Sequence, residues 1–159
     1  MAYNNIDLID KMIYIEQKRK EIYIQIANEN FQNKLISIIV KTLLKNLDRN
    51  LTYYTKEKEY IEQENLSEVI NFLLYDKILF LINKFKKRLA KPDITNVKSL
   101  LKFSISWENQ VYALLIDIQG RVIEKEEDIG TNTYILLTKL IKEKEEYIKS
   151  LEAFAKRQG

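Results

Sequence analysis

Residues that could carry out catalysis are scarce in this chain of 159 residues. It contains no Cys and no His, so it lacks thiol chemistry, the commonest general base and the commonest metal ligand. A Ser or Thr nucleophile would therefore have no His to activate it. The three glycines, Gly120, Gly130 and Gly159, lie too far apart to form a phosphate-binding loop. We expect a protein that is not an enzyme, has no catalytic residues and uses no cofactor.

Paired carboxylates are the motif that would best suit a metal ion. Glu59 with Glu62, and Glu124 with Glu127, have the Glu-x-x-Glu spacing with which some all-helical pyrophosphohydrolases hold magnesium. Among 23 acidic residues such pairs arise by chance, and a solvated helix face is the favoured explanation. No metal site is predicted, and a carboxylate-metal hydrolase stays an alternative.

The sharpest charge feature is a basic cluster that contains an aromatic residue. Its five cations are Lys84, Lys86, Lys87, Arg88 and Lys91. Such clusters bind phosphate backbones, and Phe85 between them could stack on a base. The same cations would also suit a helix C-terminus, or could pair with the acidic run at 124–128. The cluster is the predicted nucleic-acid-binding site.

Tyrosine is the other residue type in excess, with ten in the chain. Tyr is enriched at protein interfaces, where the ring is covered and the hydroxyl stays wet. Tyr53, Tyr54 and Tyr60 lie on a charged helix end and form the predicted interface, and the edge of the core is their alternative location. We therefore expect a protein partner or self-association.

The apolar pattern predicts an all-α single domain over residues 1–159, a bundle of about five helices. Only three Gly and one Pro are present, which disfavours turn-rich β folds. The expected helices are 5–28, 31–63, 66–90, one that begins near Thr95 or Asn96 and stops by Gly130, and 133–157. A local β-hairpin around 103–124 is the alternative, because Phe103, Ile105 and Trp107 alternate and Gln119-Gly120 could form a turn.

The third predicted helix, 66–90, is apolar around nearly its whole circumference and is expected to lie buried in the middle of the bundle. Asn65 and Glu68 resemble a capping box at its start, and Pro92 follows its end. The polar run 17–21 in the first helix is expected to face water.

No membrane association is expected from the sequence. The longest apolar stretch, 69–82, is shorter than the roughly 20 residues needed to span a bilayer. Residues 1–10 show no basic segment followed by an apolar run, so no signal peptide is expected. Together with the absence of Cys, this indicates an intracellular, cytoplasmic protein.

Two carboxylates and two other polar pairs fall at corresponding places in the predicted helices. These are Glu16 and Glu108, and the pairs Asn50-x-x-Tyr53 and Lys144-x-x-Tyr147. In this the chain resembles the ferritin-like bundles, in which each helical hairpin supplies a Glu and then a Glu-x-x-His. Both second motifs lack the Glu and the His here. The resemblance implies a degenerate bundle whose di-iron site no longer functions.

A shorter segment suggests a different family. Ser106-Trp107-Glu108, with Tyr112 and Arg121, resembles the last helix in the helical domain of GINS replication subunits. The Arg-x-x-Lys-Ile that usually precedes it would fall at 74–78, where the Arg is missing.

The net charge of +3 is mild and does not by itself indicate a nucleic-acid binder. The leading functional hypothesis is a non-enzymatic protein–protein interaction or assembly subunit, with a nucleoprotein complex as one setting. The alternatives are direct nucleic-acid binding through the basic cluster, and a degenerate ferritin-like bundle or carboxylate-metal hydrolase.

Overall fold

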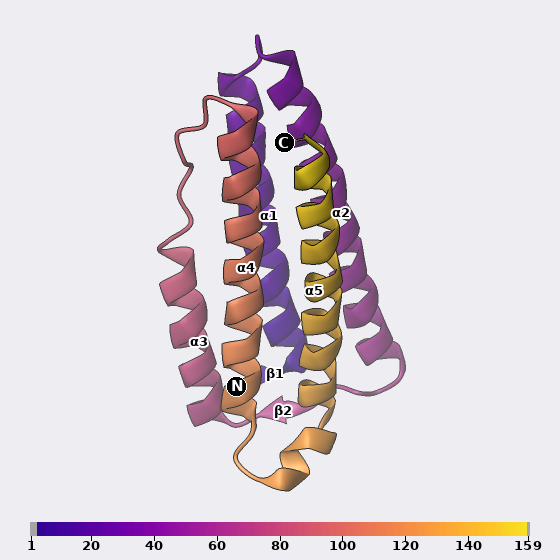
Figure 1. The fold of residues 1–159 in the computed structure, drawn as a ribbon. Helices are drawn as coiled ribbons and strands as arrows, with labels where there is room; N and C mark the ends of the chain where they lie inside the picture. Colours follow the sequence, from indigo (N-terminus) through magenta and orange to yellow (C-terminus); the bar gives the residue numbers. More distant parts are fainter. Residues whose placement is uncertain (1–2, 159) are drawn as a thin grey trace.

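The computed structural model describes residues 3–158, which form a bundle of long helices (Figure 1). The elements in chain order are β1 (Tyr3–Asn4), α1 (Asn5–Glu29), α2 (Lys34–Gln63), β2 (Val69–Ile70), α3 (Phe72–Lys86), α4 (Val97–Val122), the 3₁₀ turn η1 (Glu126–Gly130) and α5 (Asn132–Gln158). This confirms the predicted all-α bundle. The alternative hairpin at 103–124 does not form, because α4 continues through that segment as one helix.

Four of these helices are arranged as two antiparallel hairpins, α1–α2 and α4–α5 (Figure 1). Helices α1 and α5 run in one direction, and α2 and α4 run in the other. The segment 64–96 makes this possible, because it crosses from one end of the bundle to the other and carries α3. A single long crossover of this kind is also the connection used in ferritin-like bundles.

Asparagine side chains begin four of the helices. The side-chain oxygens that accept a first-turn N–H belong to Asn4, Asn33, Asn71 and Asn96. An asparagine cap satisfies a donor that has no partner inside the helix, typically for about 1 kcal/mol. The caps fix where α1, α2, α3 and α4 start.

The third helix lies at the side of the bundle, so the prediction of a buried central helix is wrong. Its inward residues are Tyr75, Ile78, Ile82 and Phe85. By contrast, Phe72, Leu73 and Phe80 are 66%, 71% and 68% exposed. The physical reason is that the apolar stripes of α1, α2, α4 and α5 already cover one another, which leaves α3 one side to pack.

The chain before α3 is extended and pairs with the N-terminal residues. Val69–Ile70 forms a two-residue antiparallel ladder with Tyr3–Asn4. The buried side chain of Asn5 donates to the Leu66 carbonyl and accepts from the Glu68 N–H, at 3.1 and 3.0 Å. The helical pattern predicted from residue 66 therefore fails, because these backbone groups bond to the start of α1.

Glu68 does not cap α3, as the predicted capping box required. Its carboxylate accepts hydrogen bonds from the Asn132 and Thr133 N–H groups, each at 3.0 Å, and from the Thr133 hydroxyl at 2.6 Å. It thus caps α5, a helix more than sixty residues away in the chain. Asn65 has a φ of 55°, a left-handed conformation that asparagine tolerates in turns.

The apolar core is divided into two parts, one toward each end of the bundle. In α1, for example, Ile15 belongs to one part and Tyr23 to the other. Buried polar and charged side chains lie between them. No helix within residues 3–158 is long and apolar enough to cross a membrane.

Candidate functional site

Four charged side chains form a buried layer between the two parts of the core. This charge layer consists of Glu16 and Arg19 from α1, Glu108 from α4 and Lys144 from α5, all at most 2% exposed. Arg19 donates to Glu16 at 2.7 Å and also to Glu108. The Lys144 amino group lies 2.8 Å from one Glu108 oxygen and 3.6 Å from one Glu16 oxygen.

The register of the helices places these charges inside. Arg19 follows Ile15 by four residues and precedes Tyr23 by four, so it occupies the apolar stripe of α1. Lys144 follows Ile141 by three residues and precedes Ile148 by four. The prediction that 17–21 faces water is therefore wrong for Arg19.

The layer holds equal numbers of cations and carboxylates, and each cation lies next to both carboxylates. Burial would lower the pKa of Lys144, but the Glu108 and Glu16 carboxylates outweigh it and hold that pKa above its ordinary value. Burial would raise the pKa of Glu108, but Arg19 and Lys144 hold it below its ordinary value. Two carboxylates and two cations thus bring no net formal charge into the interior.

Further polar groups surround this layer. The Arg19 guanidinium lies 4.8 Å from the centre of the Trp107 ring, a cation–π contact. The Tyr23 hydroxyl donates to Ser104 at 3.0 Å, and burial raises the pKa of Tyr23 to about 12. Tyr54 is also fully buried, and burial raises its pKa to about 12. The Asn50 side chain beside its hydroxyl offsets part of that rise in pKa.

Three of the four positions picked out by the ferritin-like resemblance lie together here. Lys144 contacts both Glu16 and Glu108, and the fourth, Asn50, is buried on α2 one turn from Tyr54. A di-iron site does not fit these residues, because Lys144 and Arg19 supply the positive charge that the carboxylates require. Across residues 3–158 no three acidic side chains converge as metal ligands.

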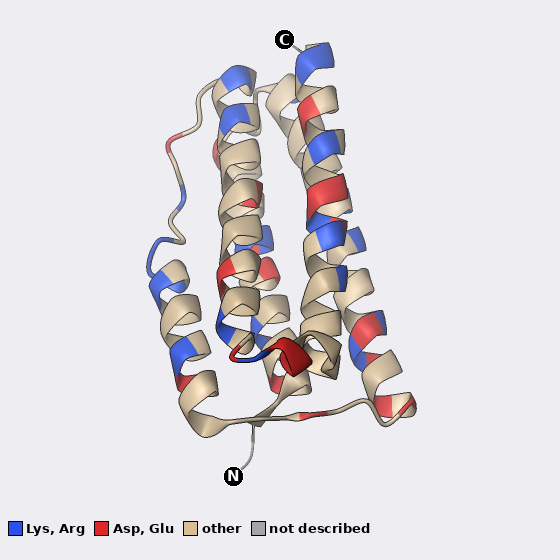
Figure 2. Ribbon diagram, turned by 60° about the horizontal axis from the view of Figure 1, so that its bottom comes forward, with Lys and Arg blue, Asp and Glu red and all other residues tan. Residues whose placement is uncertain are grey.

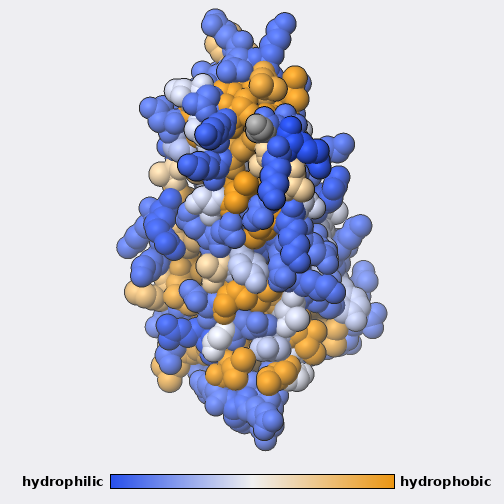
Figure 3. All heavy atoms as spheres, in the orientation of Figure 1, coloured by the Kyte–Doolittle hydropathy of each residue, from blue (hydrophilic) through white to orange (hydrophobic). Residues whose placement is uncertain are grey.

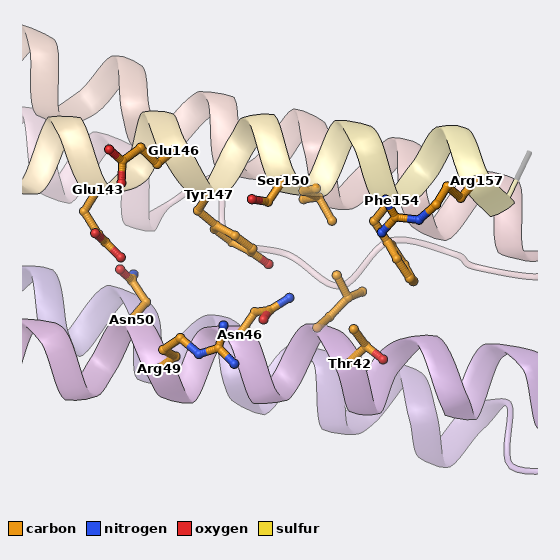
Figure 4. A pocket seen from close by; sticks show the side chains of 12 residues that line it. Thr42, Asn46, Arg49, Asn50, Glu143, Glu146, Tyr147, Ser150, Phe154 and Arg157 are labelled. Atoms are coloured by element: carbon orange, nitrogen blue, oxygen red, sulfur yellow. The ribbon is translucent and has the colours of Figure 1, made fainter.

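A groove beside the charge layer opens between α2 and α5, with a volume of about 370 Å³. We call it the α2–α5 groove and define it by Asn46, Arg49 and Asn50 from α2 and by Glu143 and Tyr147 from α5, continuing to Phe154. Figure 4 shows the two asparagines and Tyr147 pointing into the space between the helices. The Lys144 amino group lies 5.8 Å from the centre of the Tyr147 ring, so this groove-lining tyrosine is next to the charge layer.

The α3 outer face is the largest group of exposed apolar side chains on one segment of the chain. It consists of Val69, Phe72, Leu73 and Phe80, which are 71%, 66%, 71% and 68% exposed. Figure 3 shows hydrophobic atoms at the surface along the left edge, where α3 lies in Figure 1. Sequence analysis identified the apolar character of this segment but assigned it to the interior.

Only some residues of the predicted basic cluster are exposed and without a partner among the contacts described here. Lys91 pairs with Glu29 at 2.6 Å, and the Lys86 amino group lies 4.3 Å from the Tyr14 ring. Lys84 near the end of α3 is exposed, as are Lys87 and Arg88 just after it. Figure 2 shows blue bands in this part of the chain. Phe85 is 1% exposed, so its predicted stacking on a base is wrong.

The three predicted interface tyrosines lie in different environments. Tyr60 is 46% exposed, and Tyr53 is partly buried. Tyr54 is completely buried beside the charge layer, so an interface role is wrong for this residue in the folded chain.

The predicted carboxylate pairs lie on the surface. Glu59 and Glu62 are exposed on α2, and Glu124 and Glu127 are exposed around η1. In that acidic turn Asp128 accepts from the backbone N–H groups of Glu124 and Lys125, and these bonds lower its pKa. None of these carboxylates has the enclosed setting of the charge layer.

No family model matches this chain, and no match was found among curated proteins or solved structures. Function is therefore inferred from the exposed faces and buried groups of the chain itself.

Proposed function

We propose that this protein is a non-enzymatic interaction subunit that binds a partner protein on the α3 outer face. The supporting observation is the exposure of Val69, Phe72, Leu73 and Phe80, each of which is at least 66% exposed. At about 200 Å² for a large side chain, they expose on the order of 500 Å² of apolar surface. The largest apolar patch on a monomeric protein typically measures about 300–600 Å², and such patches are often functional.

The shape and charge of this face fit an amphipathic helix with acidic flanks. Leu73 and Phe80 are seven residues apart, so they lie two turns apart along one line of α3. A helix packed alongside would bring apolar residues at the same spacing against them. Lys77, Lys84 and Lys87 are exposed beside this line and would attract acidic side chains of the partner.

Direct nucleic-acid binding through the basic cluster has less support. Only Lys84, Lys87 and Arg88 of its five cations are exposed, and no aromatic residue among them is available for stacking. These three cations lie next to the α3 outer face, which is compatible with a subunit that works inside a nucleoprotein complex. Filter binding at low salt should show no retention of single-stranded or duplex DNA beyond a general charge effect.

Photo-crosslinking from the α3 outer face tests the proposal. A photoreactive phenylalanine analogue replaces Phe80 in the full chain, and the control carries it at Lys142, which is exposed on α5. We expect a discrete protein adduct from position 80 and none from position 142. Changing Lys84 and Lys87 to Glu should weaken that adduct, because the partner segment is acidic.

The crosslinked peptide, identified by mass spectrometry, decides the outcome. A helical segment with apolar residues seven apart and acidic neighbours supports the proposal. Equal adducts from positions 80 and 142, or no adduct from 80, would contradict it. An adduct of twice the chain mass would identify self-association instead of a separate partner.

A further inference from the structure

The α2–α5 groove has opposite charges on its two walls that do not pair with each other. Arg49 lines it from α2, and Glu143 lines it from α5 (Figure 4). Within residues 3–158 neither of them has an ion-pair partner. Farther along the same two helices, Lys139 does pair with Glu57, at 3.4 Å. The groove therefore leaves an unpaired cation on one wall and an unpaired carboxylate on the other.

The lining changes from charged to apolar along the groove. Figure 4 shows Arg49 and Glu143 toward one end and Phe154 toward the other. The apolar end also includes Leu43 and Leu151, which are buried. A ligand that matches this lining has a positive and a negative charge close together and a large apolar group beside them.

An amino acid with a large apolar side chain has this chemistry. Its carboxylate can accept two parallel hydrogen bonds from a guanidinium such as that of Arg49. Its ammonium group, like that of lysine, has three donors for a carboxylate such as that of Glu143. The Tyr147 and Asn46 side chains point into the groove and offer further hydrogen bonds to the same charged groups (Figure 4).

The size of the groove also fits a small molecule. Its volume of about 370 Å³ lies in the range of roughly 300–1,000 Å³ that is typical of ligand pockets. We propose that the α2–α5 groove binds a free amino acid with a large apolar side chain. The carboxylate lies on Arg49, the ammonium group lies on Glu143, and the side chain extends toward Phe154.

Other classes of ligand match the lining less well. A polyanion would gain Arg49 but would lie next to Glu143 and Glu146. A wholly apolar molecule would fill the end at Phe154, but it would cover the charged groups without pairing them. A peptide carries its two terminal charges at opposite ends, so it cannot present both from one α-carbon.

Isothermal titration calorimetry with L-phenylalanine tests this proposal on the full chain. Low ionic strength is used because Arg49 is exposed and salt would screen it. N-acetyl-L-phenylalanine and L-phenylalaninamide each lack one of the two charges, and we expect each to bind at least tenfold more weakly than L-phenylalanine. Glycine lacks the apolar group and should give no measurable heat. Arg49→Gln and Glu143→Gln should each weaken L-phenylalanine binding at least fivefold.

Matched controls locate the effect in the groove. Arg121→Gln and Glu145→Gln make the same changes at exposed positions that do not line it, and should leave the affinity for L-phenylalanine within twofold of wild type. Replacing Leu73 and Phe80 by Ser on the α3 outer face should also leave this affinity unchanged. Failure of the proposed function and failure of this proposal can therefore be told apart.

Three results would overturn the proposal. The first is an absence of heat when wild type is titrated with L-phenylalanine up to its solubility limit. The second is N-acetyl-L-phenylalanine binding as tightly as L-phenylalanine. The third is equal affinity of the Arg49→Gln and Arg121→Gln variants for L-phenylalanine.

Discussion

Replacing Lys144 by Met tests whether the charge layer is a coupled unit. The Lys144 amino group is 1% exposed and lies 2.8 Å from Glu108 and 3.6 Å from Glu16. Methionine fills a similar volume, so the main change is the lost charge. Arg19 then remains the one cation of the layer, facing two buried carboxylates. Breaking a buried pair from one side typically costs about 3–5 kcal/mol, and we expect a loss of that size at pH 7.

Urea denaturation followed by circular dichroism measures this loss. The control is Lys142→Met, the same substitution at an exposed position of the same helix, which should change the unfolding free energy by no more than about 0.5 kcal/mol. Unfolding free energies of Lys144→Met and wild type that agree within that margin would refute the account of the charge layer.

The pH dependence gives an independent check. In wild type the pKa of Glu108 is lowered on folding, so its contribution is present above the unfolded pKa and is lost as pH falls. In Lys144→Met one carboxyl group of the layer should instead take up a proton, with a folded pKa above the unfolded value. The difference in unfolding free energy between wild type and Lys144→Met should therefore be largest at pH 7 and shrink toward pH 4. A difference in unfolding free energy that does not change with pH would contradict this reasoning.

Three further substitutions probe other contacts. Tyr54→Phe removes a buried hydroxyl that lies beside the Asn50 side chain, so the unfolding free energy should fall by about 1 kcal/mol, and an unchanged or higher value in urea denaturation would show that the two groups do not bond. Glu68→Gln weakens the charge-assisted cap of α5 and should lower the melting midpoint by the equivalent of about 1–2 kcal/mol, with faster amide exchange at Thr133; unchanged exchange there would argue against the cap. Ile78→Asp places an unpaired carboxylate at a fully buried position of α3 and should destabilise the fold by more than about 3 kcal/mol, whereas unchanged melting would show that α3 does not pack as described.

Helix positions were largely predictable from the sequence because their signals are local. The stripe containing Trp107, Val111 and Leu115 repeats at helical spacing, and Asn96 is a cap residue by type. The location of α3 was not predictable in the same way. An apolar circumference shows that burial of a helix is favourable. It does not show how much apolar surface the other helices leave available for packing against it. Phe72 and Phe80 remain exposed because the rest of the core is already filled.

The charge layer could be predicted only in part from the sequence. Arg19 and Lys144 each continue an apolar stripe, and that register is a signal that residue type alone conceals. The pairing of Lys144 with Glu108 could not be read, because it depends on how two helices face each other in space. The role of Glu68 was hidden for the same reason, since its partner Thr133 is 65 residues away.

The way the charge layer joins the two hairpins has a consequence for folding kinetics. Each hairpin is built from neighbours in the chain and can form early, because the loops that must close are short. Glu16 and Arg19 belong to one hairpin, and Glu108 and Lys144 belong to the other. Docking must therefore strip water from all four ions at once, which makes it the expected rate-limiting step. A chain with hydrocarbon in their place should assemble faster, but it would lose the contacts that stop one hairpin from sliding along the other.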